Sequence, residues 1–593
     1  MEERGTHSAT LADLLPRAAE MYGEMPAIRF KQGEEWVSRS FDEVADTVCT
    51  LALGLVGLGV EKGDKVSILG NTRPEWTYFD FAALSIGAVV VPIYQTNSPE
   101  ECQYVLENSD AKVVVVEDDE QLEKVRQVRG QLPMLEQVIR MTGSSEDAIS
   151  LEDLAGRGSG DSAAWEQRWS AVTKDDTCTF IYTSGTTGPP KGCVISHGNY
   201  RAMLDMVNQT SVVEQEDVSY LYLPLAHSFA LLVQFGSFDL GATLAYWERD
   251  PLKILPNLAE LKPTYFPSVP RIFEKIYTLA TGAVEKEGGL KKTIFNWAIK
   301  VGGKMREAER AGREPGFLLR RQYAFADKQV LSKIRGLFGG RLRLAVSGAA
   351  PINPEILRFF DSAGVLVLEG WGMTETSTAA TISTPDDFKI GTIGKPFPGC
   401  EVRIADDGEI LVKGPNVFQG YYKNEEATRE TIVDGWLHTG DLGSIDEDGF
   451  IRITGRKKDI IITAGGKNIT PANLENEIKQ HPLVSQCVVV GDRQPYLVAL
   501  VTLDPEEALA YAKEHDLPED PEQLSSNPEI RKSIEDQVDA INEKFARVEQ
   551  IKKIAILPRD LTQENGELTP TLKVKRAVVA QKHAPEIEKL YAS

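Results

Sequence analysis

The chain has 593 residues, of which 42% are hydrophobic, and its 65 Lys and Arg stand against 88 Asp and Glu, for a formal net charge of -23. This length is more than one hydrophobic core serves, so we expect a globular protein of two or more domains. The negative charge argues against sequence-independent nucleic-acid binding, which needs a basic surface, and we expect no nucleic-acid partner.

Six scattered cysteines show no CxxC spacing. This argues against a disulfide framework and a zinc site, and it favours a reducing, cytoplasmic compartment. The N-terminus lacks a basic segment followed by an apolar one, so we expect no signal peptide. No apolar run reaches the ~18 residues that a membrane span needs. Peripheral contact with the inner face of a membrane stays open, and so does a dimer.

The first half of the chain alternates between helical and strand-like patterns. Residues 9–58 carry apolar residues at helical spacing and predict helix. The short β-branched runs 64–71, 87–94 and 111–119 predict buried strands with helices between them. This alternation favours parallel sheets covered by helices. The polar, Gly- and Ser-rich stretch 141–163 predicts a surface loop.

Three later segments share one design, in which a buried strand leads into a loop of small and polar residues. They are residues 177–183 with the loop that follows, 341–351 and 365–376. Ligands in open α/β sheets bind at the carboxyl ends of the strands. We therefore expect the three loops to converge on one pocket.

Residues 283–335 are helical in tendency and rich in Lys and Arg. We interpret this segment as a solvated helical cap. An interfacial segment is the alternative, because "GFLLRR" places apolar residues beside cations. From about residue 400 the pattern turns β-rich, with hairpin turns at DDG and DEDG, and after 470 helices and strands mix again.

The loop "SGTTGPPKG" that follows strand 177–183 has the composition of a phosphate-binding loop. Its glycines, Gly185 and Gly188, allow a ligand to approach the backbone closely. Hydroxyls and the cation of Lys191 suit phosphate oxygens, which accept hydrogen bonds and carry negative charge. The spacing differs from that of the P-loop, since a proline precedes the lysine.

This loop resembles the signature loop of the AMP-forming, adenylate-forming enzymes, which include acyl-CoA synthetases, luciferases and adenylation domains. Further segments resemble the family's motifs in the same order along nearly the whole chain. They are "YLPLAHSF" (222–229), "VSGAAP" (346–351), "GWGMTET" (370–376), "LHTGDLG" (437–443), "GRKKDIIITAGGKNI" (455–469) and "LTPTLKVKR" (568–576).

Within that superfamily, "VPRIFEKI" (269–276), the helical insert after it and "GREPG" resemble the long-chain fatty acyl-CoA synthetase branch. The resemblance implies an α/β fold: a large N-terminal lobe of parallel-type sheets between helices, a β-rich subdomain, and a small mobile α+β C-terminal domain. We expect a large domain at 1–455, a hinge at 456–458 and a C-terminal domain at 459–593.

The implied activity is long-chain fatty acid–CoA ligation. ATP and a fatty acid give acyl-AMP and pyrophosphate, and coenzyme A then displaces AMP to give acyl-CoA. The protein must hold two anions at bonding distance, which needs cations and aligned donors. Glu375 is the candidate ligand of Mg²⁺, which one or two carboxylates plus phosphate oxygens usually hold. Thr374 would bond the α-phosphate, and His227 would line the path of the thiol.

Lys573 matches the family's catalytic lysine, whose charge would bridge the carboxylate and the α-phosphate. Thr571 and Leu572 stand where the family commonly has Ser-Gly. Trp371 stands where the family usually has tyrosine; its face can stack on adenine, but a tyrosine hydroxyl role would be lost. The implied contacts to ATP and CoA come from Thr183, Ser184, Gly185, Thr186, Thr187, Gly188, Lys191, Gly348, Ala349, Gly370, Trp371, Gly372, Asp441, Arg456, Lys458, Gly465 and Gly466, with Lys458 as the hinge pivot.

Three other functions compete with this interpretation. An acyl-AMP ligase that loads a carrier protein tends to carry an insertion that restrains rotation, and the chain shows none between 455 and 475. A luciferase-like oxidoreductase fits less well with the long helical insert. A non-catalytic nucleotide binder would not require both Glu375 and Lys573.

Overall fold

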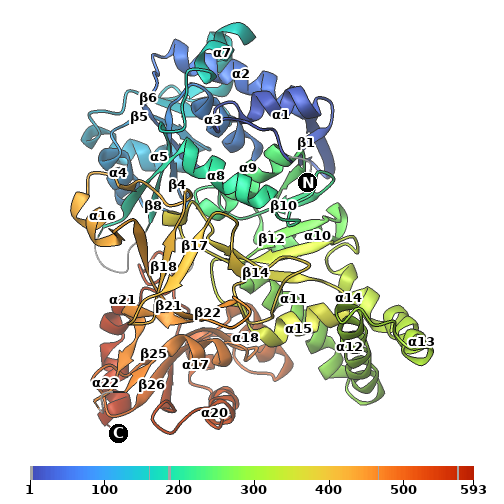
Figure 1. Cartoon of the computed structure of the whole chain (residues 1–593). Helices are drawn as coiled ribbons and strands as arrows, with labels where there is room; N and C mark the ends of the chain where they lie inside the picture. Colours follow the sequence, from blue (N-terminus) through green and yellow to red (C-terminus); the bar gives the residue numbers. More distant parts are fainter. Residues whose placement is uncertain (1–3, 159, 184–188, 465–466, 570–572, 593) are drawn as a thin grey trace.

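Two lobes with separate hydrophobic cores make up the molecule (Figure 1). The computed structural model describes residues 4–158, 160–183, 189–464, 467–569 and 573–592. Among these, the core residues up to Ile451 and those from Ile461 onward belong to different clusters, and we call the two parts the large lobe and the C-terminal lobe.

Two sheets form the frame of the large lobe, and most strand pairs inside them are parallel. The first sheet contains, in spatial order, β16 (Lys395–Pro396), β15 (Thr381–Ile382), β14 (Val367–Trp371), β13 (Leu344–Ser347), β12 (Tyr265–Ser268), β10 (Val218–Leu221), β11 (Thr243–Tyr246), β1 (Pro26–Gln32) and β2 (Glu35–Ser40). The second contains β19 (Gly420–Tyr421), β9 (Lys191–Ser196), β8 (Thr177–Thr183), β4 (Val89–Ile93), β3 (Lys65–Leu69), β5 (Ala111–Val116), β6 (Gln137–Arg140) and β7 (Ile149–Ser150). All six strands expected between residues 64 and 376 are present.

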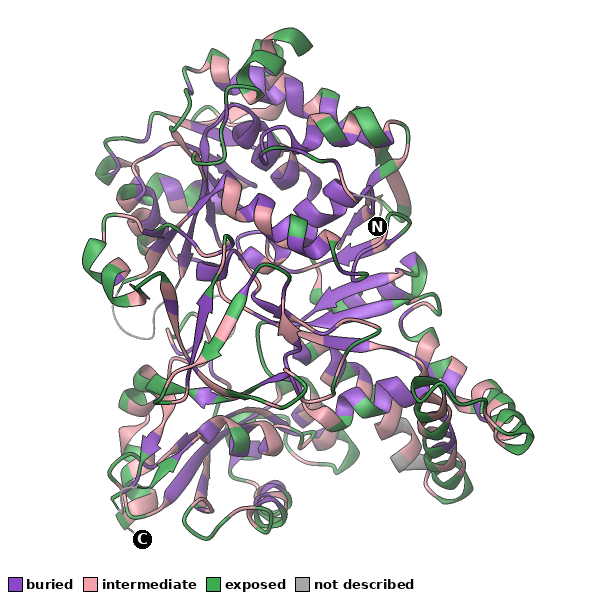
Figure 2. Cartoon of the chain, viewed as in Figure 1, coloured by how far each residue is buried: buried purple, intermediate pink, exposed green. Residues whose placement is uncertain are grey.

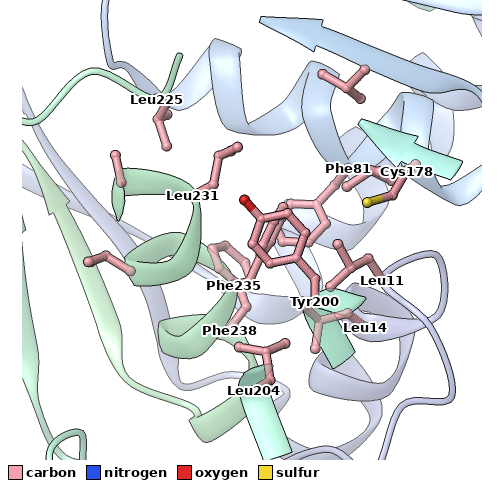
Figure 3. Packing of buried hydrophobic residues seen from close by; sticks show 14 of the residues in the cluster. Leu11, Leu14, Phe81, Cys178, Tyr200, Leu204, Leu225, Leu231, Phe235 and Phe238 are labelled. Carbon is pink, nitrogen blue, oxygen red and sulfur yellow. The ribbon is translucent and has the colours of Figure 1, made fainter. Parts of the chain in front are cut away.

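Helices cover these sheets and fill the space between them (Figure 1). They are α1 (Leu14–Tyr22), α2 (Phe41–Gly57), α3 (Pro74–Ser85), α4 (Pro99–Asn108), α5 (Asp119–Val128), α6 (Leu151–Arg157), α7 (Ser162–Trp169), α8 (His197–Asn208), α9 (Ser228–Leu240), α10 (Ile254–Leu261), α11 (Pro270–Glu287), α15 (Pro354–Ala363) and α16 (Glu425–Thr431). Helices α8 and α9 meet in an aromatic core, where the rings of Tyr200 and Phe235 pack edge to face 5.2 Å apart (Figure 3). This core makes α9 a rigid support for the residues at its N-terminus.

Two local predictions were wrong in part. Residues 9–58 contain the hairpin of β1 and β2 between two helices, because β1 pairs in parallel with β11, a partner distant in sequence. The expected loop 141–163 contains β7 and α6 and the start of α7. Leu154 of α6 is buried against α2 at Gly54, where an added Cβ would lie 3.0 Å from the Leu154 side chain. Tertiary contacts of this kind override local composition.

A β-rich subdomain follows, as expected from residue 400 onward. Its strands are β17 (Glu401–Ile404), β18 (Glu409–Lys413), β20 (Ile432–Val433), β21 (Trp436–Ile445) and β22 (Ile451–Arg456). The antiparallel register of β21 and β22 places Asp441 opposite Arg456.

The C-terminal lobe packs helices around a three-stranded sheet of its own. Its elements are β23 (Ile461–Ile462), β24 (Asn468–Ile469), α17 (Pro471–Ile478), β25 (Val484–Val490), β26 (Leu497–Leu503), α18 (Pro505–Glu514), α19 (Pro521–Ser525), α20 (Pro528–Asn542), β27 (Ile551–Ile556), α21 (Arg576–Lys582) and α22 (Ala584–Ala592). Together with the large lobe this confirms the predicted fold class.

Among the residues that the structure describes, polar contacts join the lobes at two places. On one side, Arg271 of α11 pairs with Asp504, and Lys275 pairs with Glu506 at 2.9 Å. On the other, the Gln563 amide donates to Thr96 Oγ1 at 2.9 Å.

The predicted basic segment is a helical hairpin that projects from the large lobe (Figure 1). Helices α12 (Gly289–Arg310) and α13 (Phe317–Ala326) form its arms, and α14 (Ser332–Gly336) leads back to the sheet. Much of its surface is exposed (Figure 2).

All six cysteines are free and buried. No helix in the described parts of the chain combines the length and the apolar character needed to cross a bilayer.

Candidate active site

A cavity of about 1360 Å³ lies where the strand-end loops of the large lobe face the C-terminal lobe. It brings together every predicted site residue that the structure describes. These are Thr183, Lys191, His227, Gly348, Ala349, Gly370, Trp371, Gly372, Thr374, Glu375, Asp441, Arg456, Lys458 and Lys573. The predicted residues Ser184, Gly185, Thr186, Thr187, Gly188, Gly465 and Gly466 lie outside the described residues.

Strand ends and the loops that follow them carry the large-lobe residues to this cavity. Thr183 ends β8 and pairs in register with Lys191, which begins β9. Gly348 directly follows β13, and Thr374 lies three residues after the end of β14. The carboxyl ends of strands are the usual ligand sites of such sheets.

Glu375 is held by a tyrosine that the sequence did not single out. Its carboxylate is buried, and Oε1 accepts a hydrogen bond from the Tyr421 hydroxyl at 2.7 Å. Burial, and then the charge of Glu375, raise the pKa of Tyr421, so this hydroxyl stays a donor. The ammonium of Lys191 lies 5.1 Å from the centre of the Tyr421 ring. The side chain of Tyr421 thus contacts both the acidic Glu375 and the basic Lys191.

Trp371 makes a contact that its expected stacking role did not include. Its indole Nε1–H donates to Asp441 Oδ2 at 2.9 Å, and Arg456 Nε pairs with the other oxygen, Oδ1, also at 2.9 Å. A carboxylate accepts about four hydrogen bonds, so Asp441 keeps capacity for further donors. The indole and the guanidinium fix the plane of this carboxylate.

The small residues of the site have different reasons to be small. Ala349 has φ +66°, in the left-handed region. An added Cβ at Gly372 would lie 2.3 Å from the Thr378 carbonyl oxygen, so this glycine serves the packing of its own loop. At Gly370 the nearest atom would be a flexible methyl of Ile382 at 2.8 Å, and at Gly348 it would be a ring carbon of Phe229 at 3.3 Å.

Lys573 reaches the cavity from the C-terminal lobe, where two hydrogen bonds join it to Thr569. The Lys573 amide donates to Thr569 Oγ1 at 3.0 Å, and the Thr569 amide donates to the Lys573 carbonyl at 2.8 Å. Buried Glu567, two residues before Thr569, pairs with Arg559 at 2.6 Å. Burial opposes ionisation of Glu567, but Arg559 prevails and lowers the pKa to about 2.

The side chain of Lys573 is water-accessible, yet it stands inside a protein-lined cavity. Desolvation by the surrounding protein, and then repulsion from Arg456, lower its pKa to about 8, against the attraction of Asp441 and Glu375. The lysine therefore carries its charge at neutral pH and loses it in mildly alkaline solution.

His227 caps the N-terminus of α9, and its Nδ1 accepts from the Phe229 amide at 3.2 Å. Burial, followed by the charge of Lys573, lowers its pKa to about 4. The ring is therefore neutral at pH 7 and carries its proton on Nε2, where it can donate.

Ion pairs hold the segment between the lobes on both sides of Lys458, through Lys457 before it and Asp459 after it. Lys457 pairs with Asp407 at 2.6 Å and with buried Glu409 at 3.2 Å, both in the β-rich subdomain. Glu409 also accepts from the Gly440 amide at 2.8 Å, next to Asp441. The neighbouring Lys458 is exposed and lines the cavity. A well-anchored residue therefore precedes the predicted pivot.

Arg576, three residues after Lys573, is tied to other parts of the C-terminal lobe. It pairs through two nitrogens with buried Glu475 of α17, and its Nε lies 3.8 Å from Asp459. Glu475 also accepts from the Val489 amide at 2.7 Å. These bonds link the segment that follows Lys573 to the start of the lobe.

One part of the cavity wall is apolar. Its lining residues come from α8, α9, β12 and β13 and the loop after α8, and they include Val207, Val212, Val213, Leu232, Val233, Gly236, Tyr265 and Val346. Two arginines from distant parts of the chain brace that loop. Arg4 donates to the carbonyls of Thr210 and Val213 at 2.9 and 2.7 Å, and Arg343 donates to those of Ser211 and Val212 at 3.1 and 2.9 Å.

Sequence reasoning missed Tyr421, Glu409 and this apolar wall. Tyr421 lies in "GYYKN", which belongs to none of the family-like motifs. It reaches Glu375 only because β19 pairs with β9 at the edge of the second sheet.

Within the described residues, no group of three or more His, Cys, Asp or Glu is arranged to hold a metal.

Comparison with known proteins identifies two matching family models. Residues 15–422 match the AMP-binding enzyme model, and residues 458–593 match that of the AMP-binding enzyme C-terminal domain. The chain is similar to long-chain-fatty-acid–CoA ligase FadD15 of Mycobacterium bovis, with 43% identity over 94% of this chain and 92% of that protein. It is 33% identical to long-chain-fatty-acid–CoA ligase ACSBG2 of Xenopus laevis, over 98% of this chain and 84% of that protein.

Solved structures share the fold. O-succinylbenzoate coenzyme A synthetase of Bacillus subtilis, in complex with ATP and magnesium ion, superimposes with a TM-score of 0.68 at 23% identity, over 95% of this chain and 98% of that chain. This confirms the predicted architecture.

Proposed function

The chain belongs to the AMP-binding enzyme family, and from this premise we propose that the protein is a long-chain fatty acid–CoA ligase. Similarity to long-chain-fatty-acid–CoA ligases over nearly the whole chain supports the activity. The observation that carries it is the cavity itself, which joins Lys573 of one lobe to Glu375, Trp371 and Asp441 of the other beside an apolar wall.

In the first half-reaction, a carboxylate oxygen of the fatty acid attacks the α-phosphorus of ATP. The bond from that phosphorus to the bridging oxygen breaks, and pyrophosphate leaves. Lys573 would place its ammonium between the two anions and stabilise the charge that develops there. Thr374 would donate to the α-phosphate, Asp441 would accept the ribose hydroxyls, and Lys191 would contact the terminal phosphates.

The donor set fits Mg²⁺ that arrives with the nucleotide. Glu375 supplies one carboxylate, already oriented by Tyr421, and phosphate oxygens and waters complete the preferred all-oxygen shell. When bound, the ion would neutralise phosphate charge. The Bacillus subtilis synthetase, which shares the fold, is in complex with ATP and magnesium ion, and this supports the same pair of ligands here.

In the second half-reaction, the sulfur of coenzyme A attacks the acyl carbon. A carbon–sulfur bond forms, the bond from carbon to the phosphate oxygen breaks, AMP leaves, and the thiol proton passes to solvent. His227 is a weak base, since burial and Lys573 hold its pKa near 4. We assign it to the wall of the thiol path, as a donor. Lys458 would be the pivot on which the C-terminal domain, residues 459–593, turns from residues 1–455 between the two steps.

The apolar wall would receive the acyl chain. Around Gly236, an added Cβ would meet only the Leu204 side chain, at 3.9 Å, so a larger side chain has room to enter the cavity.

We also place the enzyme in the cytoplasm, at the inner face of a membrane. The six buried free cysteines support a reducing compartment.

Pyrophosphate release over a series of fatty acids, with and without coenzyme A, tests this proposal. We expect release with long acids, and multiple turnovers only when coenzyme A is present. Gly236→Phe should shift the preference to shorter acids, while Gly236→Ala, which fits without strain, should not. Acyl-AMP that accumulates but is never consumed by coenzyme A would instead identify an acyl-AMP ligase.

A further inference from the structure

The helical hairpin of α12 and α13 carries two apolar surfaces, and only one of them is used inside the protein. The inner surface joins Ala298 and Val301 of α12 to Leu319, Tyr323 and Ala326 of α13. These contacts hold the arms together, so the shape of the hairpin needs no further partner.

The outer surface of α13 is apolar and faces solvent. Phe317, Leu318 and Phe325 are 71%, 69% and 54% exposed. Their spacing places them on one side of the helix, away from the inner residues at 319, 323 and 326. Leu290, Phe317 and Leu318 are the three most exposed large apolar side chains in the described parts of the chain. Single exposed apolar residues are ordinary, but a cluster on one helical face marks a contact surface.

Cations surround this apolar face. Residues 289–326 contain nine Lys and Arg against three Glu, in a chain whose net charge is -23. The Arg321 guanidinium lies 4.7 Å from the centre of the Phe317 ring. Exposed Arg320 and Arg313 flank the same end of the hairpin. The hairpin projects from the large lobe (Figure 1), and it is both basic and apolar on an acidic protein.

We propose that the outer face of α13 docks the enzyme on an anionic lipid bilayer. Phe317, Leu318 and Phe325 enter the boundary between head groups and acyl chains, and Arg313 and Arg321 contact lipid phosphates. A flat anionic surface matches both the charge and the projection of the hairpin. A second copy of the chain does not, because two basic hairpins repel each other. The purpose of docking rests on the proposed function, because a fatty-acid substrate dissolves in bilayers. Binding of the hairpin to lipid does not depend on that function.

Flotation of the full-length protein with lipid vesicles tests the docking surface. One set of vesicles is pure phosphatidylcholine, and the other contains phosphatidylcholine and phosphatidylglycerol at roughly 2:1. The apolar variant is F317S/L318S/F325S, and its control is L252S, at a similarly exposed leucine outside the hairpin. The charge variant is R313E/R321E, and its control is R493E, at an exposed arginine of the C-terminal lobe.

We expect binding to phosphatidylglycerol vesicles only, and weaker binding at high salt. Each hairpin variant should lose at least tenfold in partition, and both controls should bind like the wild type. Circular dichroism and pyrophosphate release with a water-soluble, short acid should stay unchanged in all variants, which separates docking from catalysis. Equal partition of the wild type and both hairpin variants would overturn the proposal. So would a halved molecular mass of the apolar variant in solution, since that result would make the face a dimer interface.

Discussion

At the scale of single residues, we expect Lys573 to be needed in the first half-reaction and not in the second. Replacing it by alanine removes the ammonium that would lie between two anions, while the later attack of a thiol on acyl-AMP needs no such cation. We expect K573A to lose acyl-AMP formation, measured as ATP–pyrophosphate exchange, by a factor of about 100 or more. Transfer from supplied acyl-AMP to coenzyme A should stay within a few fold of wild type. Equal loss of both steps would refute the assigned role.

The same lysine predicts a pH dependence. Desolvation lowers the pKa of Lys573 to about 8, so the group is charged below that pH and neutral above it. The kcat/KM of adenylation should therefore fall as pH rises through 8, toward tenfold per pH unit. K573R keeps its charge throughout this range, so its lower activity should show no such decline. An identical decline in K573R would assign the titration to another group.

Trp371 also allows a sharp test, because the structure gives it a partner. If its indole positions Asp441 for the ribose, W371F should raise the KM for ATP roughly tenfold, the usual scale for a hydrogen bond to a charged group. The penalty should shrink with 2′- or 3′-deoxy-ATP, each of which lacks one of the two ribose hydroxyls. W371Y, which keeps a ring and a donor, is the matched control. A penalty of equal size with all three nucleotides would favour stacking on the base.

At the scale of elements, the segment 457–459 contains Lys457, which ion pairs anchor, and Lys458, which is exposed. Lys458→Pro fixes φ and removes an amide donor at the predicted pivot. We expect adenylation within about threefold of wild type and strong loss of transfer from supplied acyl-AMP to coenzyme A. Lys458→Ala removes only the side chain and should keep both steps. If the proline variant transfers at the normal rate, position 458 is not the pivot.

Six strands of the two large sheets could be predicted, because they are short, β-branched and mostly buried, as at residues 111–116. The hairpin of β1 and β2 could not, since its strand identity depends on pairing with β11, more than 200 residues away. The motifs likewise located Glu375 and Asp441, but not the hydroxyl of Tyr421 or the indole bond of Trp371. Such partners arise from sheet edges and loop packing, which leave no local pattern in the sequence.

At the scale of the whole molecule, the lobes are held in the arrangement that brings Lys573 into the cavity. The ion pairs Arg271–Asp504 and Lys275–Glu506 contribute to that arrangement. Exposed pairs are worth about 0.2–1 kcal/mol each, so R271A/K275A should slow adenylation roughly two- to thirtyfold. Transfer to coenzyme A should be unaffected or faster. The arginine and lysine are the residues to change, because Asp504 also caps α18.

R17A, at another surface ion pair of the large lobe, is the control for a general loss of charge. Raising the ionic strength should reduce the difference between R271A/K275A and wild type, since salt weakens the same pairs. A variant that slows both half-reactions equally would show that these pairs do not select between lobe arrangements.

The burial of all six cysteines has a consequence for an enzyme that handles a thiol substrate. Burial raises the pKa of every one of these thiols, so the folded protein offers almost no thiolate for exchange. Mixed disulfides with coenzyme A are thereby suppressed. A chromogenic disulfide reagent added to samples of the reaction then measures the free thiol of coenzyme A alone. A colour change in a sample that lacks coenzyme A would report unfolding of the protein.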